Sequence, residues 1–334
     1  MKPYLIKLQN SDPFTKEELE EVFISIIDKK YNDLQIAAFL FALSLKGETS
    51  QEILSLVNIL RKRAVSVNAP KDTIDVCGTG GDGRNTLNIS TAVAFVVASC
   101  DVFVAKHGNK AVSSSSGSSD VLSELGLNIG ATKERMEECL INHHLAFLFA
   151  PNYHQSLANI ASIRQSLKVR TIFNLIGPLL NPANVTRQLI GVYDKNLLNI
   201  YSEILTSLDY DRALIVNSRD GLDEISICDY TDIAEISKNS QKTYYIHPKE
   251  YGIKTYNMED IEGGDTKYNS VRMAELFNGK KDAYYDAVLL NSAASLYVSG
   301  KYDTMEGSLS KIEEVIANGY VKEKLNQIIT FLQN

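Results

Sequence analysis

The sequence predicts an α/β protein with a small all-helical N-terminal domain and a larger domain built around a mainly parallel central sheet. Three observations lead to this fold class. The chain has 334 residues, which at ~100–200 residues per domain is enough for about two domains. Only helical patterns occur between residue 15 and about residue 63, and after residue 71 short strands alternate with helices. Such alternation is typical of parallel βαβ units, which bind ligands at the carboxyl ends of their strands.

The helical part is predicted from start signals and apolar spacing. Residues 15–29 begin with a capping box between Thr15 and Glu18 and continue with apolar residues at helical spacing. Two more helices are expected at residues 33–47 and 50–65, and no strand before residue 71. The turn-rich stretch "NAPKD" then separates the two parts of the chain.

The α/β part is predicted from short runs rich in β-branched residues. Strands are expected at residues 73–77, 101–106, 145–150, 187–193, 212–217 and 285–298. Helices are expected from Ser90 and around residues 119–126. Residues 159–184 return to a helical pattern, so we expect the chain to cross between the two domains more than once.

Composition limits the classes of function. With 44% apolar and 22% charged residues the chain is typical of a globular protein, and its net charge of −7 argues against a nucleic-acid partner, which requires clustered Lys and Arg. No run reaches the ~18–20 apolar residues of a membrane helix, and the N-terminal segment is too short and polar for a signal-peptide core. The widely spaced cysteines indicate neither a zinc site nor disulfides, so we expect a cytoplasmic location: Cys77, Cys100, Cys139 and Cys228.

The stretch "IDVCGTGGDGRNTLNIST" reads as a strand, a glycine-rich turn and a helix start, and predicts a phosphate site. Gly78–Gly83 matches G-x-G-x-x-G, the dinucleotide fingerprint of dehydrogenases. That function ranks last, because the helix begins only near Ser90 and the Asp82 carboxylate would repel a pyrophosphate. The turn suits a ligand that also carries a ribose or a metal. Asn88–Thr91 places donors at a helix start, which favours anions but is also typical of an ordinary N-cap.

Residues 106–120, "KHGNKAVSSSSGSSD", follow a predicted strand directly. Lys106 can supply positive charge to a phosphate, and the serine-glycine run can form an anion-binding nest. A disordered linker is disfavoured, because linkers rarely lie between a strand and an apolar helix of one compact domain. Lys110 can instead be a solvated charge, and His107 an ordinary core histidine.

Asp223 and Glu224 are adjacent in a loop beyond the predicted strand at residues 212–217. Adjacent acid pairs such as Glu17–Glu18, Glu137–Glu138 and Glu313–Glu314 fall on predicted surface helices, so it is the loop position that distinguishes Asp223–Glu224. Mg²⁺ prefers a few carboxylates together with phosphate oxygens of a substrate. The pair is therefore a candidate Mg²⁺ site.

Taken together, "GTGGD", "NIST", "KHGNKAVSSSSGSSDVL", "RTIFNLIGPLLNPA" and "DGLDEIS", in this order and spacing, resemble the anthranilate phosphoribosyltransferase family. These pentosyltransferases of tryptophan biosynthesis join anthranilate to phosphoribosyl pyrophosphate (PRPP). The resemblance covers essentially the whole chain. It implies Mg²⁺ as cofactor, a homodimer assembled through the helical domains, and the two-domain fold of nucleoside phosphorylases and phosphoribosyltransferases. The domains implied are a helical one, residues 1–68 completed by about 163–187, and an α/β one, residues 69–162 and 188–334.

The resemblance also implies site residues, position by position. Those for PRPP are Gly78, Gly81, Asp82, Thr86, Asn88, Ile89, Ser90, Thr91, Lys106, His107, Gly108, Asn109, Lys110, Ala111, Val112, Ser113, Ser114 and Ser118. Those for anthranilate are Gly78, His107, Asn109, His154, Arg164 and Pro178. Ser90, Asp223 and Glu224 match the Mg²⁺ positions, and Lys106, Asn109 and Arg164 are the expected catalytic residues.

Some positions depart from the family pattern. Ser115 replaces a common Lys or Arg, Ser119 a common Ala and Lys110 a common Arg, and the stretch after "APNYH" lacks prolines and a glycine often found there. Two alternatives remain. A pyrimidine-nucleoside phosphorylase-like enzyme would need no paired Mg²⁺ acids. A non-catalytic, nucleic-acid-binding paralogue would carry a basic surface and eroded site motifs.

Overall fold

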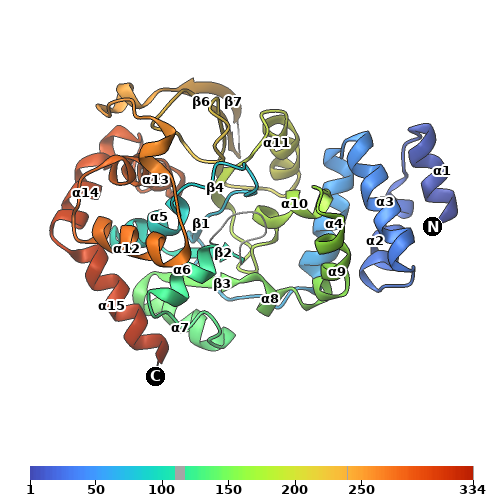
Figure 1. The fold of residues 1–334 in the computed structure, drawn as a ribbon, viewed down its shortest axis with the longest axis horizontal. Coiled ribbons are helices and arrows are strands. Elements are labelled where there is room, and N and C mark those ends of the chain that lie inside the picture. Colours follow the sequence, from blue (N-terminus) through green and yellow to red (C-terminus); the bar gives the residue numbers. More distant parts are fainter. Residues whose placement is uncertain (110–116, 239, 334) are drawn as a thin grey trace.

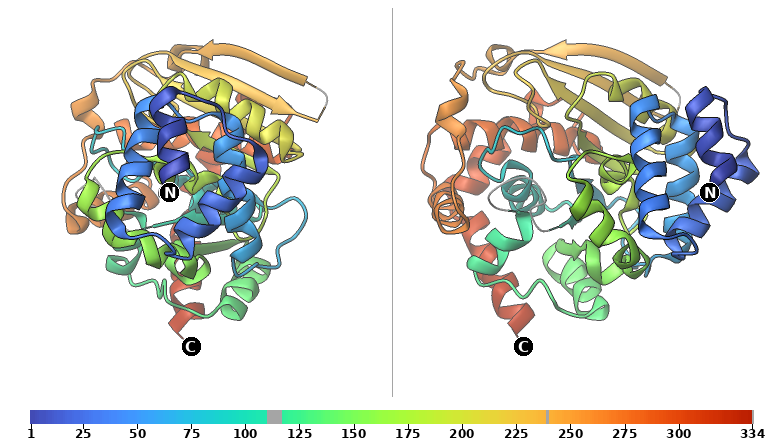
Figure 2. Two further views of the ribbon diagram at one scale, coloured as in Figure 1. Left: turned by 90° about the vertical axis from the view of Figure 1, so that its right-hand side faces the viewer. Right: turned by 45° about the vertical axis from the view of Figure 1, so that its right-hand side comes forward.

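The structure, a computed structural model of the chain, describes residues 1–109, 117–238 and 240–333. The predicted fold class is confirmed, because a helical bundle adjoins a larger part with a central, mostly parallel sheet (Figure 1). The N-terminus lies in the bundle, and the C-terminus ends the last helix on the far side of the molecule (Figures 1 and 2). Throughout the described residues, every helix is too short or too polar to span a lipid bilayer.

The bundle combines the N-terminal helices with two helices from the middle of the chain. Its members are α1 (Lys2–Asn10), α2 (Lys16–Ile27), α3 (Asp33–Lys46), α4 (Ser50–Arg63), α9 (Ala158–Leu167) and α10 (Ile172–Leu175). α9 packs against α2 and α3, and α10 packs against α3. Segments more than 100 residues apart in sequence therefore share one apolar core.

The starts of these helices follow the predicted capping chemistry. Glu18 N donates to Thr15 Oγ1 at 3.2 Å, and Thr15 N donates to Glu18 Oε2 at 2.8 Å, which confirms the predicted box. Similar boxes, Asn32–Gln35 and Thr49–Glu52, begin α3 and α4. The sequence analysis does not predict α1, which is short and contains Pro3 in its first turn, where the missing proline N–H costs no helical hydrogen bond.

Within the described residues the sheet has seven strands in the order β3-β2-β1-β4-β5-β6-β7. The strands are β1 (Ile74–Val76), β2 (Val104–Gly108), β3 (Leu145–Phe149), β4 (Arg187–Gly191), β5 (Arg212–Ser218), β6 (Thr231–Ser237) and β7 (Ser240–Ile246). β1 to β5 are parallel, and β6 and β7 are antiparallel additions at one edge. Because β1 pairs with β2 on one side and β4 on the other, its carboxyl end is a topological switch point, where open α/β sheets bind ligands.

The larger part contains further helices on the two faces of the sheet. They are α5 (Ile89–Ser99), α6 (Ser118–Glu124), α7 (Lys133–His143), α8 (Ala150–Tyr153), α11 (Leu197–Ser207), α12 (Thr266–Phe277), α13 (Ala283–Ser299), α14 (Glu306–Ala317) and α15 (Tyr320–Gln333), with 3₁₀ turns at Gln155–Leu157, Gly177–Leu180, Pro248–Tyr251 and Met258–Ile261. Alternate residues of β5 divide between two cores. Leu214 and Val216 face the core with α5 and α13, and Ala213 and Ile215 face the core of α11 and the helical bundle.

The strand predicted at residues 285–298 is wrong, because this stretch forms α13. Nearly all of α13 is buried, including the polar Asn291, Ser292 and Ser295. A helix that is enclosed on every side has no polar face, and periodicity cannot then distinguish it from a buried strand. The strand predicted at 101–106 begins later, at Val104, and the antiparallel pair β6–β7 is missing from the sequence analysis.

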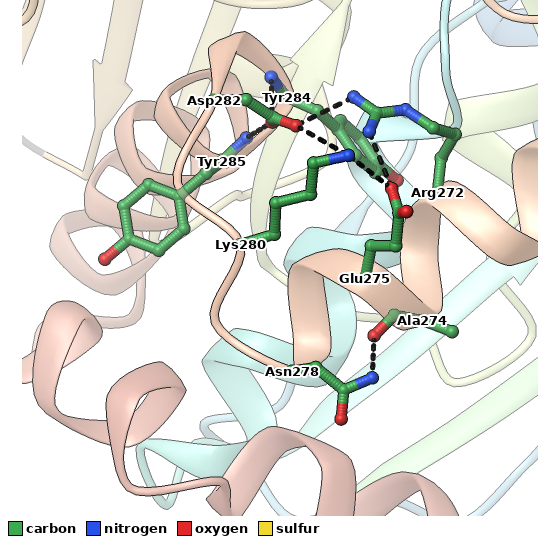
Figure 3. Close-up of polar contacts among 8 residues, drawn as sticks. All are labelled: Arg272, Ala274, Glu275, Asn278, Lys280, Asp282, Tyr284 and Tyr285. Atoms are coloured by element: carbon green, nitrogen blue, oxygen red, sulfur yellow. Dashed lines mark hydrogen bonds and ion pairs between the residues drawn. The ribbon is translucent and has the colours of Figure 1, made fainter.

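A network of polar contacts at the junction of α12 and α13 fixes the direction of α13 (Figure 3). Arg272 donates to Glu275 Oε2 at 2.8 Å and to Asp282 Oδ2 at 2.9 Å. Asp282 Oδ1 in turn accepts the Tyr284 N–H at 3.0 Å and caps the helix. Tyr284 thereby reaches the start of α5, where its hydroxyl donates to Asn88 O at 3.0 Å.

Candidate active site

A pocket of about 320 Å³ lies at the carboxyl ends of β1 and β2, between the sheet and the helical bundle. One wall consists of the loop after β1, the end of β2 and the loop that carries Asp223 and Glu224. The opposite wall is formed by Arg164, Arg170 and Phe173 from the region of α9 and α10. The pocket therefore lies at the carboxyl ends of the strands, where the alternation of strands and helices predicts a ligand site, and at the topological switch point of the sheet.

Most of the predicted site residues that the structure describes line this one pocket. They are Gly78, Gly81, Asp82, Thr86, Asn88, Ile89, Ser90, Lys106, His107, Gly108, Asn109, Ser118, His154, Arg164, Asp223 and Glu224. Lys110, Ala111, Val112, Ser113 and Ser114, together with the departing Ser115, lie outside the described residues.

Two predicted residues do not line the pocket. Thr91 is buried within α5, one position beyond Ser90, so its side chain points into the core. Pro178 is also buried, and its neighbour Gly177 takes the place on the pocket wall. The carbonyl of Pro178 is occupied by a hydrogen bond from Gln188 Nε2 at 2.9 Å. Both residues therefore lie behind the surface that a ligand would touch.

The glycine turn after β1 wraps around Asp223. Gly80 has φ +65°, a conformation that glycine adopts without steric cost, and its N–H donates to Asp223 Oδ2 at 2.7 Å. A Cβ added at Gly78 would lie 2.6 Å from Asp223 Oδ2, and one at Gly191 would lie 1.5 Å from Asp223 O. The glycines are thus needed to let this acidic loop approach β1 and β4 closely.

Three carboxyl groups meet beside this turn. Burial raises the pKa of Asp223, and the neighbouring Asp82 raises it further. Burial and the adjacent Asp223 likewise raise the pKa of Glu224. Lys106 and a hydrogen bond from the Ser90 backbone lower this pKa, but by less. Mutually repelling buried carboxylates favour a bound cation. Within the described residues, however, no group of three or more His, Cys, Asp or Glu is arranged so that it could hold a metal ion by itself.

Lys106 is almost fully buried behind the start of α5. Its ammonium donates to Val76 O at 2.5 Å and to Ser90 Oγ at 3.2 Å. These contacts hold the charge of Lys106 next to the first N–H groups of α5, which carry the positive end of the helix dipole. Two sources of positive charge therefore meet at the base of the pocket, and such a place favours an anion.

His107, at the end of β2, and His154 both line the pocket, with ring centroids 5.3 Å apart. His107 Nδ1 is 3.0 Å from Gly177 O, and since a carbonyl only accepts, this nitrogen carries the proton. Burial and the neighbouring His154 lower the pKa of His107 to about 3, so the ring is neutral at physiological pH. Its Nε2 is buried and has no hydrogen-bond partner within the described part of the chain. This acceptor distinguishes His107 from a fully satisfied core histidine.

Arg164 faces the pocket from α9. Its guanidinium carbon lies 5.6 Å from the ring centroid of Phe173, and burial lowers its pKa. Across the described residues, no hydrogen bond or ion pair engages the guanidinium. A half-buried cation without an anionic partner is a ready site for a carboxylate.

The sequence analysis assigns no site role to several residues that shape the pocket. Arg170 donates through Nη2 to Gly81 O and lies 3.9 Å above the ring of Tyr193, so it bridges the pocket from the helical bundle to the glycine turn. Two side chains hold Asn88 at the start of α5. Tyr284 OH donates to Asn88 O, and Asn269 Nδ2 donates to Asn88 Oδ1 at 3.1 Å. "RTIFN", which begins at Arg170, is part of the family resemblance, but the reach of Arg170 across the pocket depends on the fold.

Two family models match the chain, and they fit this architecture. The helical bundle domain of a glycosyl transferase family matches residues 2–64, and the a/b domain of that family matches residues 70–322. The fold and the pocket thus define a glycosyl transferase that pairs a helical bundle with an α/β domain.

Curated relatives and solved structures narrow this class. The chain is 40% identical to the anthranilate phosphoribosyltransferase of Acetivibrio thermocellus, covering 99% of this chain and 96% of the relative. It is 42% identical to that of Clostridium kluyveri, covering 95% of both. The Thermus thermophilus enzyme has a TM-score of 0.92 at 33% identity, with 99% of each chain covered. The yeast enzyme in complex with PRPP and Mg has a TM-score of 0.90 at 26% identity, with 99% of this chain and 97% of that chain covered. The chain belongs to the anthranilate phosphoribosyltransferase family, and it is a pentosyltransferase.

Proposed function

We propose that the pocket transfers the phosphoribosyl group of PRPP to the amine of anthranilate, giving N-(5-phosphoribosyl)anthranilate and pyrophosphate in tryptophan biosynthesis. The observation that carries the proposal is the division of the pocket into two chemically different halves. One half combines Lys106 and the start of α5 with Asp223 and Glu224. The other presents the unpaired Arg164 beside Phe173.

The first half suits PRPP with Mg²⁺. The positive end of the α5 dipole and the ammonium of Lys106 bind phosphate oxygens, and Asp223 and Glu224 hold the ion, with Ser90 Oγ beside them. Asp82 fits a ribose hydroxyl or a metal-bound water, which accounts for a carboxylate beside phosphates. The yeast relative in complex with PRPP and Mg supports PRPP and Mg²⁺ as the ligands of this half. Mg²⁺ supplies charge stabilisation to the departing pyrophosphate.

The second half suits anthranilate. The planar guanidinium of Arg164 can bind the carboxylate in a bidentate manner, with Asn109 and His154 nearby on the pocket wall. His107 and Gly177 line the pocket as well. A yeast relative in complex with 4-fluoroanthranilate agrees with an aromatic acceptor in this family.

The chemistry follows from this division. The amine of anthranilate is a weak nucleophile, so we expect a transition state with substantial oxocarbenium character at C1 of the ribose. Alignment of the two substrates then contributes more than a strong base. Lys106 and the start of α5 stabilise the negative charge that develops on the leaving pyrophosphate, without rearrangement during the reaction.

The proposed activity is tested by following anthranilate fluorescence after PRPP is added to the purified protein, first with Mg²⁺ and then with EDTA. We expect a Mg²⁺-dependent loss of the fluorescence. An unchanged signal, together with calorimetric binding of PRPP, would keep the donor half but refute anthranilate as the acceptor. A phosphate-dependent cleavage of pyrimidine nucleosides would instead favour the phosphorylase-like alternative.

Replacing Arg164 with alanine should weaken the use of anthranilate far more than that of PRPP. We expect the KM for anthranilate to rise about 10- to 100-fold, because a hydrogen bond to a charged group contributes about 1.5–3 kcal/mol. The KM for PRPP should change by no more than about twofold to threefold, since Arg164 lies in the other half of the pocket. Arg63→Ala is the matched control, because Arg63 pairs only with Asp28 on the bundle surface. Equal losses for both substrates would refute the role of Arg164.

We further propose that the protein is a homodimer joined through the helical domains. Leu34, Ala38, Phe41 and Leu45 form one stripe on α3 at helical spacing. The stripe is exposed in the single chain, and Leu34 and Leu45 retain 83% and 72% of their accessible surface. A continuous apolar stripe of this kind is typical of a subunit interface.

A charged residue within the stripe should therefore convert the dimer into a monomer. We expect the double variant Phe41→Glu, Leu45→Glu to elute at half the wild-type mass in size-exclusion chromatography with light scattering. Ile141→Glu is the control, because Ile141 is similarly exposed but lies on α7. Wild-type protein that is already monomeric at micromolar concentration would refute the proposed dimer.

We propose the domain division from the apolar cores, and the cytoplasmic location from the cysteines. Residues 1–68 and about 163–187 share an apolar core that also includes α11 and one face of β4–β6, which supports their assignment to one helical domain with the remainder as the α/β domain. Free cysteines at Cys77, Cys100, Cys139 and Cys228 fit a cytoplasmic enzyme.

A further inference from the structure

The segment Gly177–Leu180 lies between the pocket and the sheet, and each of its four carbonyls accepts a hydrogen bond from a side chain on another element. The donors are His107 Nδ1 to Gly177 O (3.0 Å), Gln188 Nε2 to Pro178 O (2.9 Å), Arg61 Nε to Leu179 O (2.7 Å) and His154 Nε2 to Leu180 O (2.8 Å). Since Gly177 and Leu180 line the pocket, this set of bonds determines the shape of its acceptor half.

Two of these four donor residues, His107 and Gln188, also donate to Asp75, a fully buried residue of β1 that does not line the pocket. Asp75 Oδ2 accepts from Asn181 Nδ2 at 2.8 Å and from Gln188 Nε2 at 3.2 Å, and Oδ1 accepts from His107 N at 3.2 Å. Asn181 follows the four-carbonyl segment directly and also donates to Ala105 O at 2.7 Å. One carboxylate thus connects the segment with the strand end that carries His107.

We propose that Asp75 is a positioning residue of the acceptor half: it sets the place of Gly177–Leu180 and of His107 relative to the donor half without touching either substrate. The inference rests on the proposed function, because it assumes that anthranilate binds beside His107 and Gly177. It extends that function to a residue that neither the motifs nor the pocket wall identify.

The contacts require a carboxylate at this position. Asn181, Gln188 and the His107 backbone all donate N–H groups to Asp75, and the Val76 backbone and the charge of Lys106 also favour an anion there. A carboxylate is the only side chain of this size that accepts on both of its ends. An asparagine would place an NH₂ group against either the His107 N–H or the two amides of Asn181 and Gln188. At least one buried donor would then lose its acceptor and be pushed away.

The network continues to the helical bundle. Tyr210 OH donates to Gln188 Oε1 at 3.1 Å and accepts from Arg61 Nη2 at 3.4 Å. This phenol determines which end of the Gln188 amide faces Asp75 and Pro178. Arg61 belongs to α4, so the chain of contacts runs from the bundle through Tyr210 and Gln188 to β1.

The test compares Asp75→Asn with a milder variant, Tyr210→Phe, which removes only one hydroxyl from the network. For Asp75→Asn we expect the KM for anthranilate to rise about tenfold or more, because a displacement of ~1 Å can cost about 100-fold in rate. For Tyr210→Phe we expect a rise of about twofold to fivefold, from the loss of one indirect contact. The KM for PRPP should stay within about twofold of wild type in both variants.

Glu235→Gln is the matched control. Glu235 is a buried carboxylate of β6 that accepts from Tyr244 OH at 3.0 Å and Tyr297 OH at 2.6 Å, outside the pocket. Its loss should lower the melting temperature without changing either KM. A purely structural role of Asp75 would give the same result, because a smaller folded fraction lowers the apparent kcat and leaves both KM values unchanged.

The outcomes separate the inference from the proposed function. A wild-type protein that does not consume anthranilate would refute the proposed function. An active wild type whose Asp75→Asn and Tyr210→Phe variants keep the wild-type KM for anthranilate would overturn the positioning role alone. A selective rise in that KM, graded from Tyr210→Phe to Asp75→Asn, would establish it.

Discussion

Replacing Gly191 with alanine should reduce kcat/KM at least about 100-fold, although Gly191 does not line the main pocket. An added Cβ would lie 1.5 Å from Asp223 O, so the loop with Asp223 and Glu224 must move by more than 1 Å. A displacement of that size costs about 100-fold when it affects catalytic geometry. The crowding should also destabilise the fold by about 1–3 kcal/mol. Steady-state kinetics over a Mg²⁺ titration and thermal unfolding measure both effects.

The Mg²⁺ titration shows whether the loss of activity in Gly191→Ala comes from displacement of the acidic loop. Since the loop carries the proposed metal ligands, a higher Mg²⁺ concentration should be needed for half-maximal activity. Gly307→Ala is the control, because a Cβ at Gly307, in the first turn of α14, meets only Thr304 Oγ1 at 3.4 Å. If Gly191→Ala retained activity within about threefold and needed no additional Mg²⁺, the acidic loop would not have the proposed role.

Replacing Lys106 with methionine should lower kcat/KM by about 100- to 1000-fold, the usual effect of removing one preorganised donor from a site of developing negative charge. Methionine has a similar length but no charge. Val76 O and Ser90 Oγ would lose their buried donor, which should also cost about 1–3 kcal/mol of folding free energy. Kinetics, calorimetric titration with PRPP and thermal unfolding measure the three consequences.

Lys301→Met provides the comparison for Lys106→Met. It removes the same charge from a surface position, where the ammonium donates to Cys100 O at 2.6 Å. PRPP binding should be lost only in the Lys106 variant. If both variants bound PRPP as tightly as the wild type does, the phosphate role of Lys106 would be refuted, and its function would be limited to the packing of β2 against α5.

Local sequence signals predicted those parts of the fold that depend on local interactions. The Thr15–Glu18 box is confirmed because its bonds join residues three positions apart. The first helices and the strands near Ile74, Leu145 and Arg187 follow from local patterns in the same way. Residues 285–298 were assigned wrongly because α13 is enclosed by α5, β4 and β5, which removes the polar face on which a helical pattern depends.

The candidate site also has features that local sequence patterns reveal and others that depend on distant contacts. Glycine spacing, Lys106 and the adjacent acids in a loop were visible in the sequence, because each is a short motif with its own chemistry. The reach of Arg170 to Gly81 and the convergence of Asn181 and Gln188 on Asp75 were not, since these contacts join residues about 90 to 110 positions apart. No local pattern marks the partner of such a residue.

The sequence alone therefore determined the family, the two-part architecture and the residue types proposed to bind phosphate and metal, because these reside in short segments whose chemistry does not depend on distant neighbours. Only the tertiary structure decided which residues line the pocket and which lie behind it. It shows that Gly177 rather than Pro178 lines the pocket, that the buried Nε2 of His107 has no hydrogen-bond partner among the described residues, and that Gly191 must lack a side chain. The physical reason is that burial and close approach arise from the packing of distant segments.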